Sequence, residues 1–188
     1  IPRAARGLVI FAHGSGSSRF SSRNWFVAEI LHEHDIATLL IDLLTEQEEE
    51  IDMQTRHLRF DIPLLAERLV EIANWAKKNP KTKNLKIGYF GSSTGGGAAL
   101  IAAAQKPDDI AAVVSRGGRP DLAGEFLSKV KAPALLIVGQ RDIQVLELNR
   151  EALDKLNKSS QLIIIPGATH LFEEHGTLKL AAQSAMKW

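Results

Sequence analysis

The stretch GYFGSSTGGGAAL, residues 88–100, places two adjacent serines between an apolar run and a cluster of glycines. Only Ser93 satisfies the pattern G-x-S-x-G, because Gly91 precedes it by two residues and Gly95 follows it by two. A nucleophile on a sharp turn from strand to helix has a strained backbone, and glycines at these places remove the collisions that side chains would make. The stretch therefore predicts a strand, a tight turn that presents Ser93, and a helix. The alternative is a glycine-rich helix N-terminus that binds an anion or only turns the chain.

Short, continuous apolar runs recur along the whole chain and predict strands that are buried on both faces. These runs lie at residues 7–14, 36–44, 85–91, 110–118, 132–142 and 161–170. Helical patterns lie between them, at residues 22–34, 61–79, 95–105, 121–130, 145–157 and 172–188, the last interrupted by Gly176. This alternation predicts a single three-layer α/β domain over residues 1–188, with a mostly parallel sheet of about six strands, helices on both faces and no large cap.

Residues 45–60, TEQEEEIDMQTRHLRF, fit neither pattern. The segment is polar, acidic and long for a connection between two elements. We expect a solvated loop here, in preference to an excursion of the chain beside the functional site.

The bulk composition excludes several classes of function. Basic side chains number 23 and acidic side chains 22, so the charge gives no reason to expect binding to nucleic acid or to an anionic membrane. The chain has no cysteine, which excludes disulfides, thiolate catalysis and thiolate metal sites and fits a cytoplasmic location. No apolar run reaches the ~18 residues of a membrane span, and no secretory leader is visible.

A serine hydroxyl becomes a good nucleophile only when a histidine takes its proton and an acid orients that histidine. In an α/β sheet of parallel strands the partners should follow later strands, in the order serine, acid, histidine. His170 directly follows the apolar run 161–165, whereas His175 is expected inside the next helix, so we predict His170 as the base.

The orienting acid is predicted to be Asp142, which follows the apolar run 134–139. Asp121 follows the preceding run, but its sequence context is typical of a helix N-cap. A surface turn is the alternative role for Asp142.

Acyl transfer also needs hydrogen-bond donors for the developing oxyanion. The amide of Thr94, directly after the nucleophile, is one expected donor. The loop FAHGSGSS, residues 11–18, would supply the other through the amide of Ser15, with His13 bracing the loop. The alternative is that residues 13–18 are only a flexible turn.

At these residues the chain resembles the α/β-hydrolase superfamily, and within it the small, lidless dienelactone hydrolase-like serine hydrolases. The resemblance covers nearly the whole chain and rests on His13-Gly14-Ser15-Gly16, Gly91-Ser92-Ser93-Thr94-Gly95, Asp142 and His170, in family order. It implies a carboxylesterase-like hydrolase that cleaves a small or accessible ester through an acyl-enzyme. Dienelactone hydrolases proper use a cysteine nucleophile, which this chain lacks, so the resemblance does not extend to dienelactone as the substrate.

Several other functions compete with this prediction. A nucleotide-binding protein is disfavoured, because residues 14–19 lack the third glycine of G-x-G-x-x-G and residues 91–97 lack the lysine of a P-loop. A non-catalytic binding module on the same fold, and an acyltransferase or perhydrolase with the same triad, are the remaining alternatives. We expect no metal, no cofactor, no nucleic acid and no membrane, and a small acyl compound as partner; the sequence does not give the oligomeric state.

Arg116 and Arg119 follow the apolar run 110–115, so they should lie at the edge of the sheet that carries the site. They are candidates for holding an anionic group of the substrate. Salt bridges to nearby acids are the alternative, which we favour.

Overall fold

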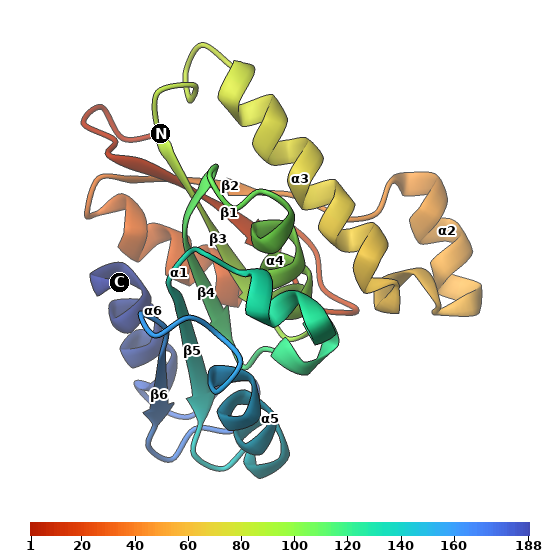
Figure 1. The fold of residues 1–188 in the computed structure, drawn as a ribbon, viewed down its shortest axis with the longest axis vertical. Helices are drawn as coiled ribbons and strands as arrows, with labels where there is room; N and C mark the ends of the chain where they lie inside the picture. The colour runs from red at the N-terminus through yellow and green to blue at the C-terminus, as the bar shows by residue number, and fades with distance from the viewer.

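A computed structural model describes residues 1–188. Its single sheet has six strands in the order β2-β1-β3-β4-β5-β6, and every neighbouring pair is parallel (Figure 1). The strands are β1 (Gly7–Ala12), β2 (Ile36–Leu40), β3 (Lys86–Ser92), β4 (Ile110–Arg116), β5 (Ala134–Gly139) and β6 (Gln161–Ile165). The prediction of one α/β domain with about six mostly parallel strands is confirmed.

Helices cover both faces of the sheet, as expected for parallel strands joined by crossovers (Figure 1). One face carries α1 (Ser22–His32) and α6 (Thr177–Lys187), and the other carries α3 (Ile62–Lys78), α4 (Thr94–Gln105) and α5 (Ile143–Leu153). Each face has its own apolar core, with 29 buried residues around α3 and α4 and 14 around α1 and α6. No cap covers the carboxyl ends of the strands, where the site is expected.

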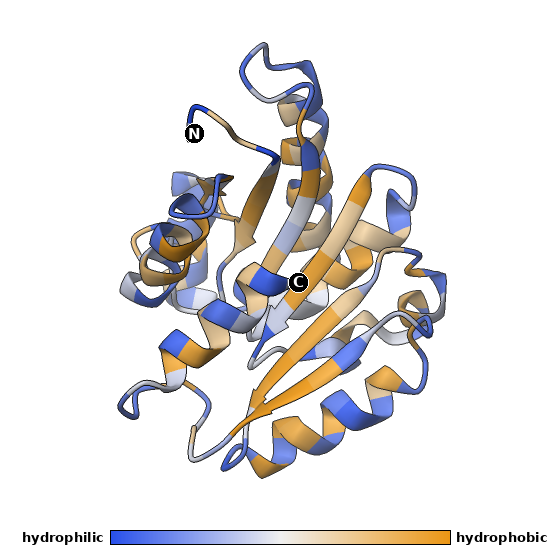
Figure 2. Ribbon diagram, turned by 90° about the vertical axis from the view of Figure 1, so that its left-hand side faces the viewer, coloured by the Kyte–Doolittle hydropathy of each residue, from blue (hydrophilic) through white to orange (hydrophobic).

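Local sequence accounts for most of these elements. Most strands are largely apolar, whereas most of the helices carry both apolar and polar positions (Figure 2). The clearest helix is α3, in which Asp61 caps the N-terminus by accepting a hydrogen bond from the Leu64 amide, and Pro63 lies in the first turn. The expected helix at residues 61–79 is confirmed.

The expectation of a loop at residues 45–60 is wrong. The segment contains α2 (Glu46–Thr55) and a short 3-10 turn, η1 (Leu58–Phe60). Thr45 and Glu48 form a capping box, in which each side chain binds the other residue's amide, and three glutamates in the first turn complement the helix dipole. The T-x-x-E spacing of Thr45 and Glu48 was the sequence signal that a helix begins here.

Two other predicted helices need correction. Residues 120–129 form two 3-10 turns, η2 (Pro120–Lys129), because the backbone breaks from helical geometry at Gly124. Helix α6 begins only at Thr177, after Gly176 at positive φ, so residues 172–176 are not helical and His175 lies before the helix. Glycine at positive φ interrupts the helix at both places.

Candidate active site

Ser93 occupies the turn between β3 and α4, with φ +50° and ψ −123°, a region that residues other than glycine rarely adopt. The flanking glycines allow the close approach that this turn requires. A Cβ on Gly91 would lie 2.4 Å from the Gly95 carbonyl oxygen, and a Cβ on Gly95 would lie 2.2 Å from the Ala12 carbonyl oxygen. The predicted strand, tight turn and helix are present in the structure.

The neighbouring serine has a different environment. Ser92 is buried, donates a hydrogen bond to Asn24 Oδ1 at 3.1 Å and accepts one from Arg116 Nη2 at 3.0 Å. Its hydroxyl therefore ties β3 to helix α1 and to strand β4. Of the two serines, Ser93 is the one whose hydroxyl has no such partners.

His170 and Asp142 meet at the carboxyl ends of β5 and β6. His170 Nδ1 donates to Asp142 Oδ2 at 2.6 Å, which leaves Nε2 with its lone pair. Asp142 is at the N-cap position of α5, yet its side chain makes no capping hydrogen bond. Its carboxylate is therefore directed at the histidine and not at its own helix.

Ser93 and His170 line the same open cavity, of about 270 Å³. No hydrogen bond joins their side chains in this structure, a separation that is common where catalytic hydrogen bonds tighten only around a substrate. The cavity lining is polar, with Leu171 as its one hydrophobic residue. The structure thus brings Ser93, His170 and Asp142 to one edge of the sheet, in the places that the sequence predicted.

The predicted oxyanion donors lie beside Ser93, but one of them is engaged. The Ser15 amide donates to Thr94 Oγ1 at 2.9 Å, which fastens the loop after β1 to the start of α4. A Cβ on Gly14 would lie 3.0 Å from the Ser93 Cβ, so this loop packs directly against the serine. The Thr94 amide is in the first turn of α4, where amides have no helical acceptor.

His13 braces the same loop, as expected. Its Nδ1 lies 3.0 Å from the Gly14 carbonyl oxygen, and its Nε2 accepts from the Leu43 amide at 3.1 Å. Because a carbonyl only accepts, Nδ1 carries the proton. Both ring nitrogens are used in holding the loop, and neither is free for chemistry.

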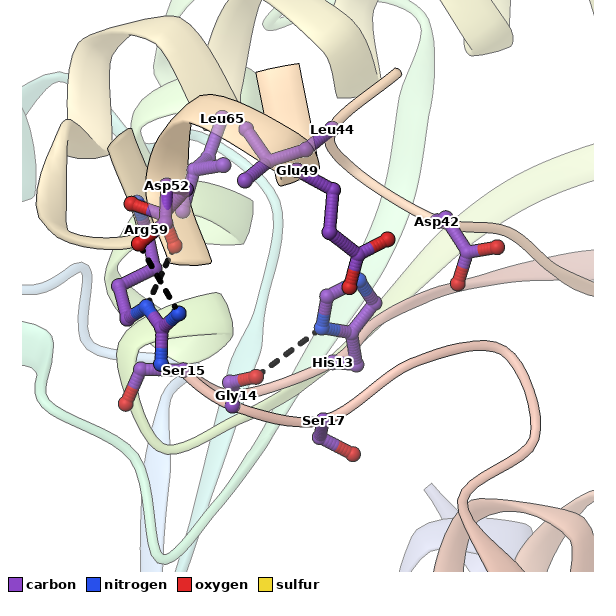
Figure 3. A pocket seen from close by; sticks show the side chains of 11 residues that line it. His13, Gly14, Ser15, Ser17, Asp42, Leu44, Glu49, Asp52, Arg59 and Leu65 are labelled. Atoms are coloured by element: carbon purple, nitrogen blue, oxygen red, sulfur yellow. Dashed lines mark hydrogen bonds and ion pairs between the residues drawn. The ribbon is translucent and has the colours of Figure 1, made fainter. Parts of the chain in front are cut away.

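Figure 3 shows the smaller cavity on the other side of this loop, of about 40 Å³, which α2 and η1 also line. Arg59 pairs there with the buried carboxylate of Asp52. Burial raises the pKa of Asp52, but hydrogen bonds from the amide and guanidinium of Arg59 outweigh that effect and lower it. Residues 45–60 are therefore the excursion beside the site that the sequence analysis disfavoured.

The two candidate arginines differ in environment. Arg119 forms a bidentate salt bridge with Asp121, in which Nε and Nη2 donate to the two carboxylate oxygens at 2.8 and 2.7 Å. It does not line the serine cavity. Asp121 thus pairs with Arg119 and is not the N-cap expected for it. The favoured expectation of a salt bridge applies to Arg119, whose predicted contact with substrate is not supported.

Arg116 does line the serine cavity, and no acidic side chain pairs with it. Only 7% of the residue is exposed, and its Nε and Nη1 have no hydrogen-bond partner. Its guanidinium carbon lies 5.9 and 5.7 Å from the ring centres of Phe90 and Phe172. Burial, with the cation of Arg23 nearby, lowers the pKa of Arg116 to about 10.

A model of the dienelactone hydrolase family matches residues 26–187. The chain belongs to this family. The Anabaena variabilis dienelactone hydrolase structure is 62% identical to it, covers 100% of this chain and 87% of that one, and superposes with a TM-score of 0.98. The family and the fold indicate a hydrolytic enzyme.

Two further relatives extend the comparison. A protein of Mycobacterium tuberculosis with the provisional name phosphoribosyl transferase is 55% identical over 188 residues, and the chain spans 42% of its length. Est1E from Butyrivibrio proteoclasticus is 20% identical, with a TM-score of 0.81 over 99% of this chain and 89% of that one, which shows the shared fold.

No helix has the length and apolar composition needed to cross a bilayer. No group of three or more histidine or acidic side chains is arranged to hold a metal ion.

Proposed function

We propose that the chain is a serine hydrolase of the carboxylesterase type, which cleaves a small or accessible ester or related acyl compound through an acyl-enzyme. The observation that carries the proposal is the hydrogen bond from His170 Nδ1 to Asp142 at 2.6 Å, beside a cavity that also contains Ser93 on its strained turn. A glycine-rich turn that served only packing would not need a hydrogen-bonded histidine and aspartate beside it.

The reaction follows from the roles that these positions allow. His170 Nε2 takes the proton of Ser93 as the hydroxyl attacks the ester carbonyl, and Asp142 holds the ring in the required tautomer and stabilises the imidazolium. The proton passes to the leaving alcohol, and His170 then activates a water that hydrolyses the acyl-enzyme. Acyl transfer to an acceptor other than water, including perhydrolysis, would use the same groups.

The oxyanion of the tetrahedral intermediate would be received by the amides of Thr94 and Ser15. The Thr94 hydroxyl accepts the Ser15 hydrogen bond in this structure, so rotation about χ1 of Thr94 would have to release that amide first. The Thr94 amide, in contrast, needs no such rotation before it can donate to the oxyanion.

The names of the relatives bear on the substrate to different degrees. The 62% identical structure is titled a dienelactone hydrolase, and an ester bond in a lactone is within the proposed chemistry. The proposed nucleophile of this chain is a serine, and the chain has no cysteine that could replace it. Dienelactone itself is therefore not the substrate we propose. The transferase name describes a protein of which the chain spans only 42%, and nothing in the site favours that activity.

The test is covalent labelling with a small neutral fluorophosphonate, read by intact mass. We expect one adduct on the wild type and none on Ser93→Ala, with Ser92→Ala labelled as a control, followed by turnover of short-chain esters. A folded wild type without an adduct would favour the non-catalytic binding module. Loss of the adduct in Ser92→Ala but not in Ser93→Ala would show that the wrong serine has been assigned.

A further inference from the structure

The serine cavity contains a buried cation that the proposed hydrolysis does not use. Arg116 is more than nine-tenths buried at the end of β4, and the cavity lining includes no acidic residue. A buried charge is costly unless it is paired, and removal from water disfavours an unpaired guanidinium strongly. Two aromatic rings at almost 6 Å compensate for it only weakly.

Arg116 lines the open cavity, and its unpaired Nε and Nη1 are buried just behind the cavity wall. Arg116 is held in place by its hydrogen bond to Ser92, the residue next to the nucleophile. An anion that entered beside Ser93 would lie in the same cavity as this guanidinium, and contact with the buried Nε and Nη1 would require a shift of the side chain. An anionic ligand is the simplest group that satisfies this environment.

The first turn of helix α1 adds further positive potential. Ser21, Arg23 and Asn24 from this turn line the cavity, and the turn has no acidic residue. Ser21 accepts from the Asn24 amide, whereas the amides of Ser22 and Arg23 make no hydrogen bond within the chain. Unpaired amides and the helix dipole together favour an anion at a helix N-terminus.

Arg23 is the second cation of the cavity. Its nearest acidic partner is the exposed Glu173, at 3.7 Å, which is a weak pair. An anion between Arg23 and Arg116 would be attracted to both, so the cavity is suited to more than one negative charge. Ser15, Ser17 and Ser21 also line it.

We propose that this cavity binds a phosphate group of the substrate, so that the ester cleaved at Ser93 carries a phosphoryl group held by Arg116 and Arg23. The inference rests on the proposed hydrolase function. A phosphate dianion balances two arginines and offers three oxygens in a tetrahedral arrangement to donors from α1, β4 and the serine hydroxyls. A carboxylate has one charge and two coplanar oxygens, and would leave part of this donor set unpaired.

The experiment measures how anions protect Ser93 from labelling by a neutral fluorophosphonate. For each variant, the labelling rate with inorganic phosphate is divided by the rate with acetate at matched ionic strength. We expect phosphate to slow labelling of the wild type saturably and acetate to have little effect. Arg116→Met and Arg23→Met should each weaken the apparent phosphate affinity at least ~10-fold, whereas the control Arg119→Met should keep it.

The outcomes separate this inference from the proposed function. Normal labelling without phosphate protection, or equal protection by acetate, would overturn the phosphate site and leave the hydrolase intact. Protection that survives Arg116→Met would overturn the role of that residue. If the wild type is not labelled at all, calorimetric titration with inorganic phosphate still measures the site, and an absence of binding would refute it independently of Ser93.

Discussion

Replacing Arg116 by methionine should make the protein more stable, against the usual direction of a substitution at a buried position. Methionine keeps a long, flexible side chain between Phe90 and Phe172 but removes a charge that no acid neutralises. Replacement of buried charges by apolar side chains of similar volume is often stabilising. The gain would identify Arg116 as a residue retained for binding and not for folding.

The expected magnitude follows from three effects. Burial lowers the pKa of Arg116 to about 10, which means that the folded state holds the charged guanidinium less favourably by about 3 kcal/mol. Loss of the hydrogen bond to Ser92 costs about 1 kcal/mol. Loss of the two distant cation–π contacts costs about 1 kcal/mol together. We therefore expect the free energy of unfolding to rise by about 1 kcal/mol, or the Tm by about 2–4 °C for a chain of this length.

The pH at which the gain is measured matters. A base whose pKa is lowered on folding destabilises the folded state at every pH below that lowered pKa, so the full gain is expected at pH 7. The destabilisation by Arg116 fades only as the pH rises above about 10, because there the unfolded chain keeps a proton that the folded chain has lost.

The assay is urea unfolding followed by tryptophan fluorescence, with equal slopes required for the comparison. Arg119→Met is the control, because it removes a partly exposed pair whose loss should change the free energy of unfolding by about 1 kcal/mol or less. A fall in the stability of Arg116→Met of more than about 1 kcal/mol would refute the reasoning, since it would show that the guanidinium is well compensated within the fold.

Three further predictions concern the site and its surroundings. Asp142→Asn should lower kcat for an ester substrate by about 10⁴-fold with little change in Tm, because the side chain does not cap α5; a kcat within about tenfold of wild type would contradict its role. Gly95→Ala should fail to give folded protein or lose more than about 3 kcal/mol in urea unfolding, because its Cβ would meet the backbone oxygen of Ala12 at 2.2 Å, and near-wild-type stability would show that this turn is not tightly packed. Glu48→Gln should cost about 0.5 kcal/mol at pH 7 through the capping box with Thr45. The Thr45 amide lowers the pKa of Glu48, so this cost should vanish as the pH falls through that lowered pKa, whereas a cost that persists in acid would mean that charge is not involved.

Part of the fold and site could be predicted because it depends on local steric and apolar patterns. Continuous apolar runs can be buried only as interior strands, and their alternation with helices leaves few topologies besides a parallel sheet. Glycines two residues on either side of Ser93, and not of Ser92, located the turn. Parallel strands bring their carboxyl ends to one edge, which placed Asp142 and His170 together although they are 28 positions apart in the sequence.

Other features escaped prediction although a local signal existed. Helix α2 begins with a capping box that the sequence contains, but its acidic composition and lack of an apolar stripe are also typical of a solvated loop. The helix is fixed by contacts outside itself, among them the pair of Arg59 with the buried Asp52. Helical hydrogen bonds alone do not hold so short a segment in water.

By itself, the sequence determined the layered α/β architecture and the order of serine, acid and histidine along the chain, because steric limits at glycines and the burial of apolar runs act between near neighbours. Only the tertiary structure decided which hydrogen-bond and charge partners each polar group has. The sequence gives no means to distinguish Arg116 from Arg119, yet one is paired with Asp121 and the other is buried without an acid. The Ser15 amide likewise meets the Thr94 hydroxyl 79 residues away. Neutralisation of a charge and satisfaction of a donor depend on groups that are close in space, and the folded chain alone sets those distances.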